Sequence, residues 1–587
     1  MRLDTMKKIT SILTLFSISF SFYAQPVIEF WDNTQTKKKS EQNMKDGMQH
    51  GKSISWFENG NIAKEGNYIF GKEDGKFITY YTNKQAKKEE NYSVGKKQGA
   101  WKYWYNNGTK AQETFFKNDK PDSTWSGWYE NGKLKSTEQY ILGKKEGTWL
   151  YYHENEQKES EGAFKNDLAQ GNYTQWYSNE IKQKEGLYKD DFQTGTWKEY
   201  YKSGKNKQEL LYENKEVLLI NLWQESGEQI IKNGNGKFII AYDNGRKKGE
   251  GNYKDGRMDG VWKFYLKTGE KDYTAIYVKN KKNGKYINWF QNGNVKSEGN
   301  FLDDKKNNYW KWNNEHGKME MEGYFTDDKR SGKWVYWFET GAKESEGFYK
   351  NDLQDSAWTY WYKDTINIGK LGPKWKQGNY KADKKEALWT RWYENGEKLQ
   401  EGNYVLNKEE GTWYAWYDNG LMKDEGNFKA GVMHGSWKGW LPNKNINYEG
   451  FYKDGLKDAM WKFYFDNGKI KEEGAYKISR KEGHWKFYTP HGYLDREGDY
   501  KNEKPDGLWI YYYETGVKSM EQNFKEGQLS GNCTAWHENA KLKSTTAYKL
   551  VKNKNGTSSS KPNGKWIFYD SKGNVMMETN YKNGIKE

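Results

Sequence analysis

The most reactive side chains in this sequence belong to seven histidines and a single cysteine, Cys533. Histidine can act as a general base or bind a metal, and a cysteine thiolate can act as a nucleophile. Each role needs convergent ligands or an oriented partner. The histidines instead occupy scattered positions: His50, His153, His316, His434, His484, His491 and His537. We therefore expect no catalytic residue, no metal site and no cofactor, and we expect Cys533 to be a small core residue.

A column of glutamates recurs through the sequence, from Glu65 and Glu89 to Glu578, and lysines such as Lys117 and Lys582 form a second column. Two carboxylates in one pocket could hydrolyse a glycoside. One active site, however, does not need its acid copied along a whole chain. Cross-strand charge pairing and solvation account for both columns, and a multivalent polar surface is the alternative. We expect no enzyme, unless the irregular segments near 216–227 or 364–373 build a pocket.

Composition restricts the fold before any motif is considered. The chain has 587 residues, of which 34% are hydrophobic and 17% aromatic, with 61 glycines and 7 prolines. Leu, Ile and Val are scarce, which argues against a conventional large core, and the many aromatic residues argue against disorder. The net charge of +15 is spread over alternating signs, so we expect no nucleic-acid partner. Short strands joined by tight turns fit this composition best.

An internal repeat of 24 residues organises the chain. The segments Gly99–Gly108, Gly147–Tyr152 and Gly411–Gly420 share the pattern Gly-x-Trp-x-x-Tyr/Trp, which a further Tyr follows in the first and the third. We call the first Trp position of each repeat its anchor, numbered 0, and count 22 anchors from Ser53 onward, most of them 24 residues apart. Tryptophan occupies this position in 15 repeats, and we expect these residues to be the structural anchors: Trp101, Trp125, Trp149, Trp197, Trp262, Trp310, Trp334, Trp358, Trp389, Trp413, Trp437, Trp461, Trp485, Trp509 and Trp566.

Each repeat is predicted to be a β-hairpin. An aromatic run ends in Asn-Gly or a variant, as at Asn107-Gly108, and a return run carries Glu-Gly-x-Tyr/Phe, as at Glu250-Gly251. Asn-Gly between two such runs predicts a tight turn in which both central residues have positive φ. A lone hairpin is not stable, but stacked aromatic hairpins can bury their rings against one another. We therefore predict an all-β, elongated array of about 22 hairpins that form a continuous twisted antiparallel sheet.

Interruptions of the period suggest how the array is divided. The predicted parts are a signal peptide (1–24), an N-terminal cap (25–48), and three arrays of repeats, 49–227, 228–372 with an insertion near 364–373, and 373–587 with an insertion near 550–562. The insertions are expected to be loops, because surface loops tolerate added residues.

The pattern Gly-x-Trp-x-x-Tyr-Tyr-x-Asn-Gly-x-x-x-x-Glu-Gly-x-Tyr resembles the MORN repeat in its bacterial variant form, over nearly all of residues 49–587. The resemblance implies a solenoid-like antiparallel sheet of hairpins that serves as a scaffold or interaction surface. Some bacterial members of the family are classed as antitoxin-like. This chain departs from that pattern because it has far more repeats and an N-terminal export signal.

The N-terminus has the pattern of a secretory signal. Lys7 and Lys8 precede the apolar run Ile9–Tyr23, and Ala24 stands at the expected cleavage position. We expect export to the periplasm, cell surface or medium, with no integral membrane segment after cleavage.

Three functions are compatible with these features. The first is an exported, non-enzymatic scaffold that binds an unknown protein partner by many similar contacts. The alternatives are a module that binds a glycan or cell-envelope polymer, and an antitoxin or immunity-type inhibitor of a toxin. Because exposed sheet ends can pair with one another, a homo-oligomer is also possible.

Overall fold

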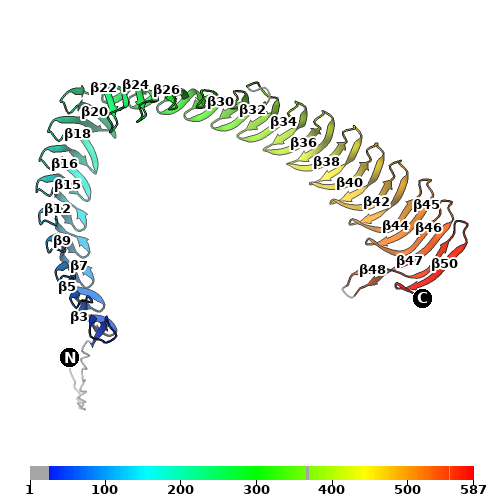
Figure 1. The fold of residues 1–587 in the computed structure, drawn as a ribbon, viewed down its shortest axis with the longest axis horizontal. Helices are drawn as coiled ribbons and strands as arrows, with labels where there is room; N and C mark the ends of the chain where they lie inside the picture. The colour runs from blue at the N-terminus through cyan, green and yellow to red at the C-terminus, as the bar shows by residue number, and fades with distance from the viewer. Residues whose placement is uncertain (1–24, 365–368, 554–555) are drawn as a thin grey trace, which may run out of the picture. The chain divides into compact units, whose positions relative to one another are not determined.

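The protein was analysed as a computed structural model, which describes residues 25–364, 369–553 and 556–587. The predicted signal peptide lies outside the described residues. Strands and turns make up the described chain, which contains no helix and therefore none long and apolar enough to span a bilayer. Two long antiparallel sheets are formed by consecutive hairpins (Figure 1). The predicted all-β array is therefore confirmed.

The first sheet contains 21 strands. They are β1 (Gln25–Phe30), β2 (Lys38–Lys45), β3 (Met48–Trp56), β4 (Ile62–Ile69), β5 (Lys72–Tyr80), β6 (Ala86–Ser93), β7 (Lys96–Lys97), β8 (Gly99–Trp104), β9 (Lys110–Lys117), β10 (Lys120–Pro121), β11 (Ser123–Trp128), β12 (Leu134–Ile141), β13 (Lys144–Lys145), β14 (Gly147–Tyr152), β15 (Lys158–Lys165), β16 (Leu168–Trp176), β17 (Lys182–Lys189), β18 (Phe192–Tyr200), β19 (Asn206–Glu213), β20 (Glu216–Trp223) and β21 (Gln229–Ile231).

The second sheet contains 30 strands. They are β22 (Gly236–Ala241), β23 (Lys247–Lys254), β24 (Arg257–Tyr265), β25 (Lys271–Val278), β26 (Lys281–Trp289), β27 (Val295–Leu302), β28 (Lys305–Asn313), β29 (Met319–Thr326), β30 (Lys329–Trp337), β31 (Lys343–Lys350), β32 (Leu353–Trp361), β33 (Lys374–Lys381), β34 (Lys384–Trp392), β35 (Lys398–Val405), β36 (Lys408–Trp416), β37 (Met422–Lys429), β38 (Val432–Trp440), β39 (Ile446–Lys453), β40 (Leu456–Tyr464), β41 (Ile470–Lys477), β42 (Arg480–Tyr488), β43 (Leu494–Lys501), β44 (Lys504–Tyr512), β45 (Lys518–Lys525), β46 (Gln528–Trp536), β47 (Leu542–Lys552), β48 (Ser558–Pro562), β49 (Gly564–Tyr569), β50 (Val575–Lys582) and β51 (Ile585–Lys586).

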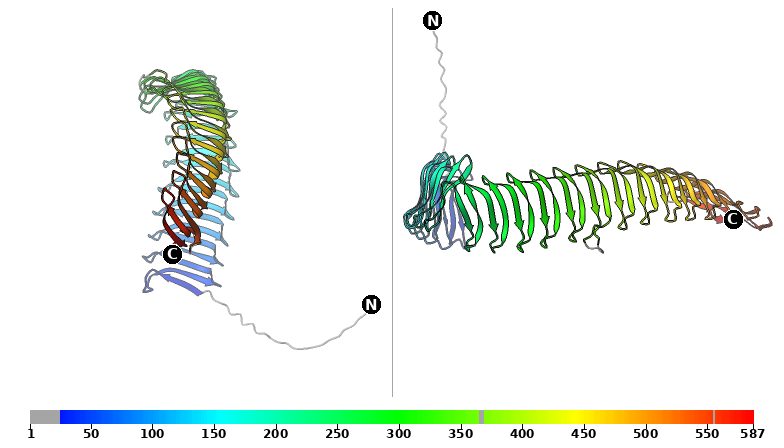
Figure 2. Two further views of the ribbon diagram at one scale, coloured as in Figure 1. Left: turned by 90° about the vertical axis from the view of Figure 1, so that its right-hand side faces the viewer. Right: turned by 90° about the horizontal axis from the view of Figure 1, so that it is seen from above.

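Contacts divide the chain into two compact units, the first comprising residues up to 262 with 278–280, and the second comprising 263–277 with 281–587. Within each unit the hairpins stack side by side in a single layer, with their turns along the two edges (Figure 2). The predicted insertion near 364–373 separates β32 from β33, which still pair from Ser356↔Tyr380 to Trp361↔Lys374. The predicted insertion near 550–562 extends the sheet as the hairpin β47–β48. The division into three arrays stays a prediction.

The register of a single repeat assigns its side chains to two faces. In the hairpin β30–β31, Trp334 at position 0 lies opposite Gly347 at +13, and Val335 at +1 lies opposite Glu346 at +12. Because side chains alternate along a strand, positions −4, 0, +2, +11, +13 and +15 share one face, which we call the aromatic face. Positions −1, +1, +12 and +14 share the other, which we call the charged face.

Alternating rings hold the aromatic face together. Phe325 contacts Trp310 and Trp334 with ring centroids 6.3 and 5.2 Å apart, and Tyr349 contacts Trp334 and Trp358 at 5.9 and 5.1 Å, all in edge-to-face geometry. Such pairs stabilise beyond the area that they bury. Ladders of rings thus form most of the core in place of aliphatic side chains, and an aliphatic cluster of Leu219, Leu222 and Ile231 interrupts them.

In most repeats a glycine at +13 allows the next anchor ring to lie flat on the preceding strand. A Cβ at Gly323 would come within 2.2 Å of the Trp334 ring. In the first sheet, Glu90, Thr114 and Glu138 occupy +13 instead. The strands that carry the next anchors are interrupted there, as β7/β8, β10/β11 and β13/β14. A side chain beneath a tryptophan therefore breaks the strand that crosses it.

The two turns of a repeat have different geometries, and one prediction about them was wrong. At the Asn-Gly turn, Gly108 has a φ of +85° but the φ of Asn107 is negative. The Tyr105 amide bonds to the Thr109 carbonyl, and the Thr109 amide bonds to the Asn107 side chain. This is a three-residue loop with glycine in the left-handed position. The two-residue turn with both φ values positive is the other one, at Asn351 (+52°) and Asp352 (+69°).

Side chains in the Asn-Gly turns link successive repeats along one edge. The Tyr105 hydroxyl donates to the Trp128 carbonyl at 2.9 Å, and the Asn107 amide donates to the Glu130 carbonyl at 3.1 Å. Both contacts recur in many repeats and join residues that are 23 positions apart, for example Tyr417 to Trp440 and Asn467 to Pro490. Tyrosine at +4 and asparagine at +6 are thus structural residues of the repeat.

Candidate functional site

The 15 predicted anchors all serve the aromatic face. Each donates its indole Nε1–H to a backbone carbonyl at 2.9–3.2 Å, usually that of the residue ten positions earlier. Twelve are buried, and Trp125, Trp437 and Trp566 are half-buried. Their polar edges are occupied within the sheet, so the anchors are structural residues of the array.

Cys533 takes an anchor position and is buried, as expected. Burial raises the pKa of its thiol, which disfavours a nucleophilic thiolate.

Two histidines replace the tyrosine at +4. His153 and His537 contact the carbonyls of Trp176 and Tyr569 through Nε2, both at 3.0 Å, and so reproduce the tyrosine contact.

His484 departs from the expectation that no histidine has an oriented partner. Its Nδ1 lies 3.0 Å from Asp499 and its Nε2 lies 3.1 Å from Glu497. The side chain is half exposed, and no group of metal-binding side chains occurs in the described part of the chain. Position −1 was not recognised from the sequence because its partners, at +12 and +14, lie across the hairpin.

The glutamate column forms a ladder of ion pairs on the charged face. Glu346 lies 3.2 Å from Lys333 and 2.9 Å from Lys343, while Glu449 lies 3.5 Å from Lys438 and accepts a hydrogen bond from Tyr464 at 2.7 Å. The tyrosine belongs to the next repeat, so the column also joins repeats. The predicted cross-strand charge pairing is therefore found, with lysines at −1 and +1 as its cross-strand partners in place of the lysine column at +16, while the lysine at +9 pairs along the same strand.

Burial and pairing act in opposite directions on these carboxylates. Partial burial works to raise the pKa of Glu497, but hydrogen bonds from Tyr512 and His484 outweigh it and the pKa is lowered. At Glu298 the hydrogen bond from Lys311 is the largest effect and also lowers the pKa. The carboxylates thus remain charged at neutral pH, which suits a charged surface and not a general acid.

Exposed apolar side chains lie beside this ladder in the second unit. They occupy positions −1 and +14 of the charged face, and we call them the apolar row: Tyr309, Tyr324, Phe348, Leu388, Phe451, Met460 and Leu508. Met460 is 53% exposed and Tyr324 48%. Large exposed apolar side chains that gather beside paired charges are typical of a recognition surface.

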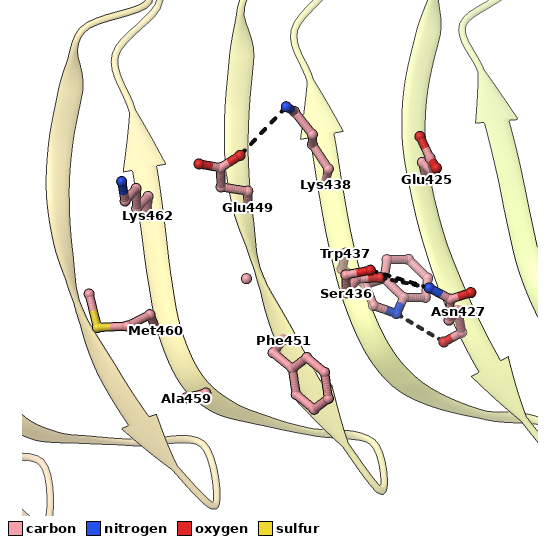
Figure 3. A pocket seen from close by; sticks show the side chains of 11 residues that line it. Glu425, Asn427, Ser436, Trp437, Lys438, Glu449, Phe451, Ala459, Met460 and Lys462 are labelled. Atoms are coloured by element: carbon pink, nitrogen blue, oxygen red, sulfur yellow. Dashed lines mark hydrogen bonds and ion pairs between the residues drawn. The ribbon is translucent and has the colours of Figure 1, made fainter.

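A groove of about 550 Å³ opens on the charged face between β37 and β40. Phe451 and Met460 from the apolar row line it, together with Asn427, Ser436 and the ion pair Lys438–Glu449 (Figure 3). The side chains project from neighbouring strands toward the same side of the sheet (Figure 3). Its mixture of apolar and paired charged groups can accommodate side chains of a partner but contains no reactive constellation.

Comparison with known proteins identifies the repeat. A family profile described as "MORN repeat variant" matches twelve segments: 49–69, 97–118, 121–141, 145–166, 193–214, 282–303, 330–351, 385–405, 433–454, 457–477, 505–526 and 562–583. No curated protein matches the chain.

Solved structures with low similarity include "Crystal Structure of TcdB2-TccC3", 8% identical with a TM-score of 0.13, which covers 95% of this chain and 36% of that one. Another, "Crystal Structure of TcdB2-TccC3-Cdc42", is 11% identical with a TM-score of 0.10 and covers 95% and 31%. The chain thus spans about a third of the length of these structures, and scores this low carry no functional argument.

Proposed function

This chain is a MORN repeat protein, and from that premise we propose that it is an exported, non-enzymatic scaffold that binds a protein partner through its charged face. The observation that carries the proposal is the unequal use of the two faces. The rings of the aromatic face pack against one another, and their indole N–H groups donate to backbone carbonyls. The apolar row is exposed beside charges that are already paired with one another.

The geometry of the apolar row favours a protein partner. Equivalent side chains in successive repeats are two strands apart, which is about 10 Å in a sheet. Phe348, Phe451 and Met460 supply aromatic and methionine contacts, which are enriched at protein interfaces. Many weak contacts at a regular spacing add up to strong binding when one partner engages several of them.

Capture experiments with matched variants test this proposal. Purified wild-type chain and the double variant Phe451→Ser/Met460→Ser would be mixed with the organism's own envelope extract, and retained material would be identified by mass spectrometry. The control variant, Leu406→Asn/Ile478→Asn, changes two exposed apolar residues at the hairpin edge, where positive φ suits asparagine.

We expect one stoichiometric protein to be retained by the wild type and the control, and retained at least tenfold less by the row variant. Equal retention by all three would contradict a role of the apolar row. Retention of protease-treated, glycan-rich envelope without any protein would instead support the glycan-binding alternative, and a toxin as the captured protein would identify an inhibitor.

A further inference from the structure

Three cations converge on the aromatic face next to the 364–373 insertion. Lys376, Lys385 and Arg391 line a pocket of about 240 Å³ formed by β33–β36, together with Trp375, Gln400 and Tyr404. Lys376 and Arg391 lie directly opposite each other in the pairing of β33 with β34. Like charges directly opposite each other across a strand pair are destabilising, so this arrangement requires an explanation.

The three cations have no acidic partner within ion-pair distance among the described residues. The Lys376 Nζ instead lies 4.3 Å from the ring centres of Tyr360 and Trp375. The Lys385 Nζ lies 4.6 Å from the ring centre of Tyr404. Some basic residues of this face are paired, as in Lys481–Glu472 at 2.8 Å and Arg496–Asp495 at 3.0 Å, whereas lysines at position −4 such as Lys306 and Lys457 contact ring faces as Lys385 does. What distinguishes the cluster is that two of its cations, Lys376 and Arg391, lie directly opposite each other on this face.

Arg391 is an exception within the repeat. It occupies position +2, where the other 21 repeats have no lysine or arginine, and where aromatic residues such as Tyr336, Tyr360 and Phe487 are common. Lys376 occupies +11 when counted back from the anchor Trp389. The insertion lies between β32 and β33, which still pair regularly, with Tyr360 opposite Lys376. The sheet is therefore regular at this point, and the unusual feature is the cluster of basic residues on it.

The pKa shifts of the two lysines indicate an excess of positive charge in the pocket. Burial is the largest effect on both lysines and lowers the pKa of each, and the neighbouring cations lower it further. Glu409, on β36, is the acidic residue that acts in the opposite direction on Lys385. Three positive charges and this one negative charge leave a local excess of about two.

We propose that this pocket binds the phosphoryl group of a soluble phosphate monoester. A phosphate monoester carries close to two negative charges at neutral pH, whereas a carboxylate carries one. The Arg391 guanidinium offers a fork of donors that matches phosphate oxygens, and the two lysines act as flexible point charges around them. The half-buried Trp375 and the Gln400 amide leave room for a small ester group beside the phosphate. This site is independent of the apolar row, which lies on the other face.

Calorimetry on the full chain tests the proposal with inorganic phosphate as the probe, and with acetate and chloride at matched ionic strength as competitors. We expect saturable binding of phosphate and none of acetate or chloride. Arg391→Gln and Lys376→Gln should each weaken phosphate binding at least tenfold. Arg496→Gln, which removes an arginine of the same face that already has an acidic partner, should change it less than twofold.

Thermal unfolding without phosphate separates binding from folding. Arg391→Gln should be at least as stable as the wild type, because it removes a like-charge contact. The proposal is overturned if phosphate binds no better than acetate, if Arg496→Gln weakens binding as much as Arg391→Gln, or if Arg391→Gln lowers the unfolding temperature in phosphate-free buffer.

Discussion

Substitution of Gly323 by alanine tests the packing rule of the array most sharply. The added Cβ would lie 2.2, 2.4 and 2.5 Å from three ring atoms of Trp334, and ordinary contact begins at 3.4 Å. The buried ring must therefore move by roughly 1.2 Å or the strand must lift away. Either change weakens the Trp334 Nε1 bond to the Tyr324 carbonyl, now 3.0 Å, and the edge-to-face contact with Phe325.

The magnitude follows from these two losses. Overpacking of a core costs about 1–3 kcal/mol, and a lost hydrogen bond costs about 1 kcal/mol. We expect Gly323→Ala to destabilise β29–β30 by about 3 kcal/mol and to interrupt β30 near Ser331, as Glu90 and Thr114 interrupt strands in the first sheet. Because tenfold corresponds to about 1.4 kcal/mol, amide exchange of β30 should accelerate roughly a hundredfold.

Hydrogen exchange followed by mass spectrometry measures this strand by strand, which suits an array that does not unfold as one unit. Gly162→Ala is the matched control, since Gly162 occupies the same position +13 but lies beneath Tyr173, whose nearest ring atom would be 3.1 Å from the added Cβ. It should change exchange less than tenfold. The reasoning is refuted if both variants exchange alike, or if β30 keeps wild-type protection in Gly323→Ala.

Other predictions follow from the edge contacts, the glutamate ladder and the N-terminus. His153→Tyr should keep wild-type stability, whereas His153→Phe should lose about 1 kcal/mol of local stability, measured by amide hydrogen exchange, because the bond to the Trp176 carbonyl is lost. Equal stability of the two variants would contradict this role of His153. Because Lys311 lowers the pKa of Glu298 in the fold, the unfolded state binds more protons as the pH falls below about 4.3, so stability present at neutral pH should decline there. Glu298→Gln should make the melting temperature less dependent on acid pH, and an unchanged slope would argue against the ladder. N-terminal sequencing of protein from the envelope or medium should begin at Gln25, and a cytoplasmic chain with an intact N-terminus would exclude export.

Much of the fold follows from the sequence because each repeat has the same pattern of anchor, turn and return strand. Trp334 and its equivalents mark strand centres, and the 24-residue period places them one above another. The turn type was wrong at Asn107-Gly108 because the asparagine side chain bonds to the Thr109 amide and to the next repeat. The contact with the Glu130 carbonyl needs a neighbouring repeat, which a single-hairpin argument leaves out.

The surfaces were harder to predict than the framework. The cross-strand partner of Glu346 lies at −1, which only the register reveals. To predict that Lys376 lies opposite Arg391, the position of Lys376 must be counted back from Trp389, the anchor that follows the insertion. Tyr309 and Tyr324 are fifteen residues apart in sequence and form a direct pair with ring centroids 5.6 Å apart. Their exposure depends on which face the aromatic ladder occupies.

Hydroxyl-radical footprinting of the full chain, free and bound to its captured partner, tests the central proposal most directly. Met460, Tyr324 and Phe348 are exposed residues of the apolar row, and Met576, 72% exposed near the C-terminus, provides an internal reference outside it. The scaffold proposal predicts that oxidation of the row falls several-fold in the complex across successive repeats while Met576 reacts as before. Unchanged oxidation of the row in a stoichiometric complex would contradict it.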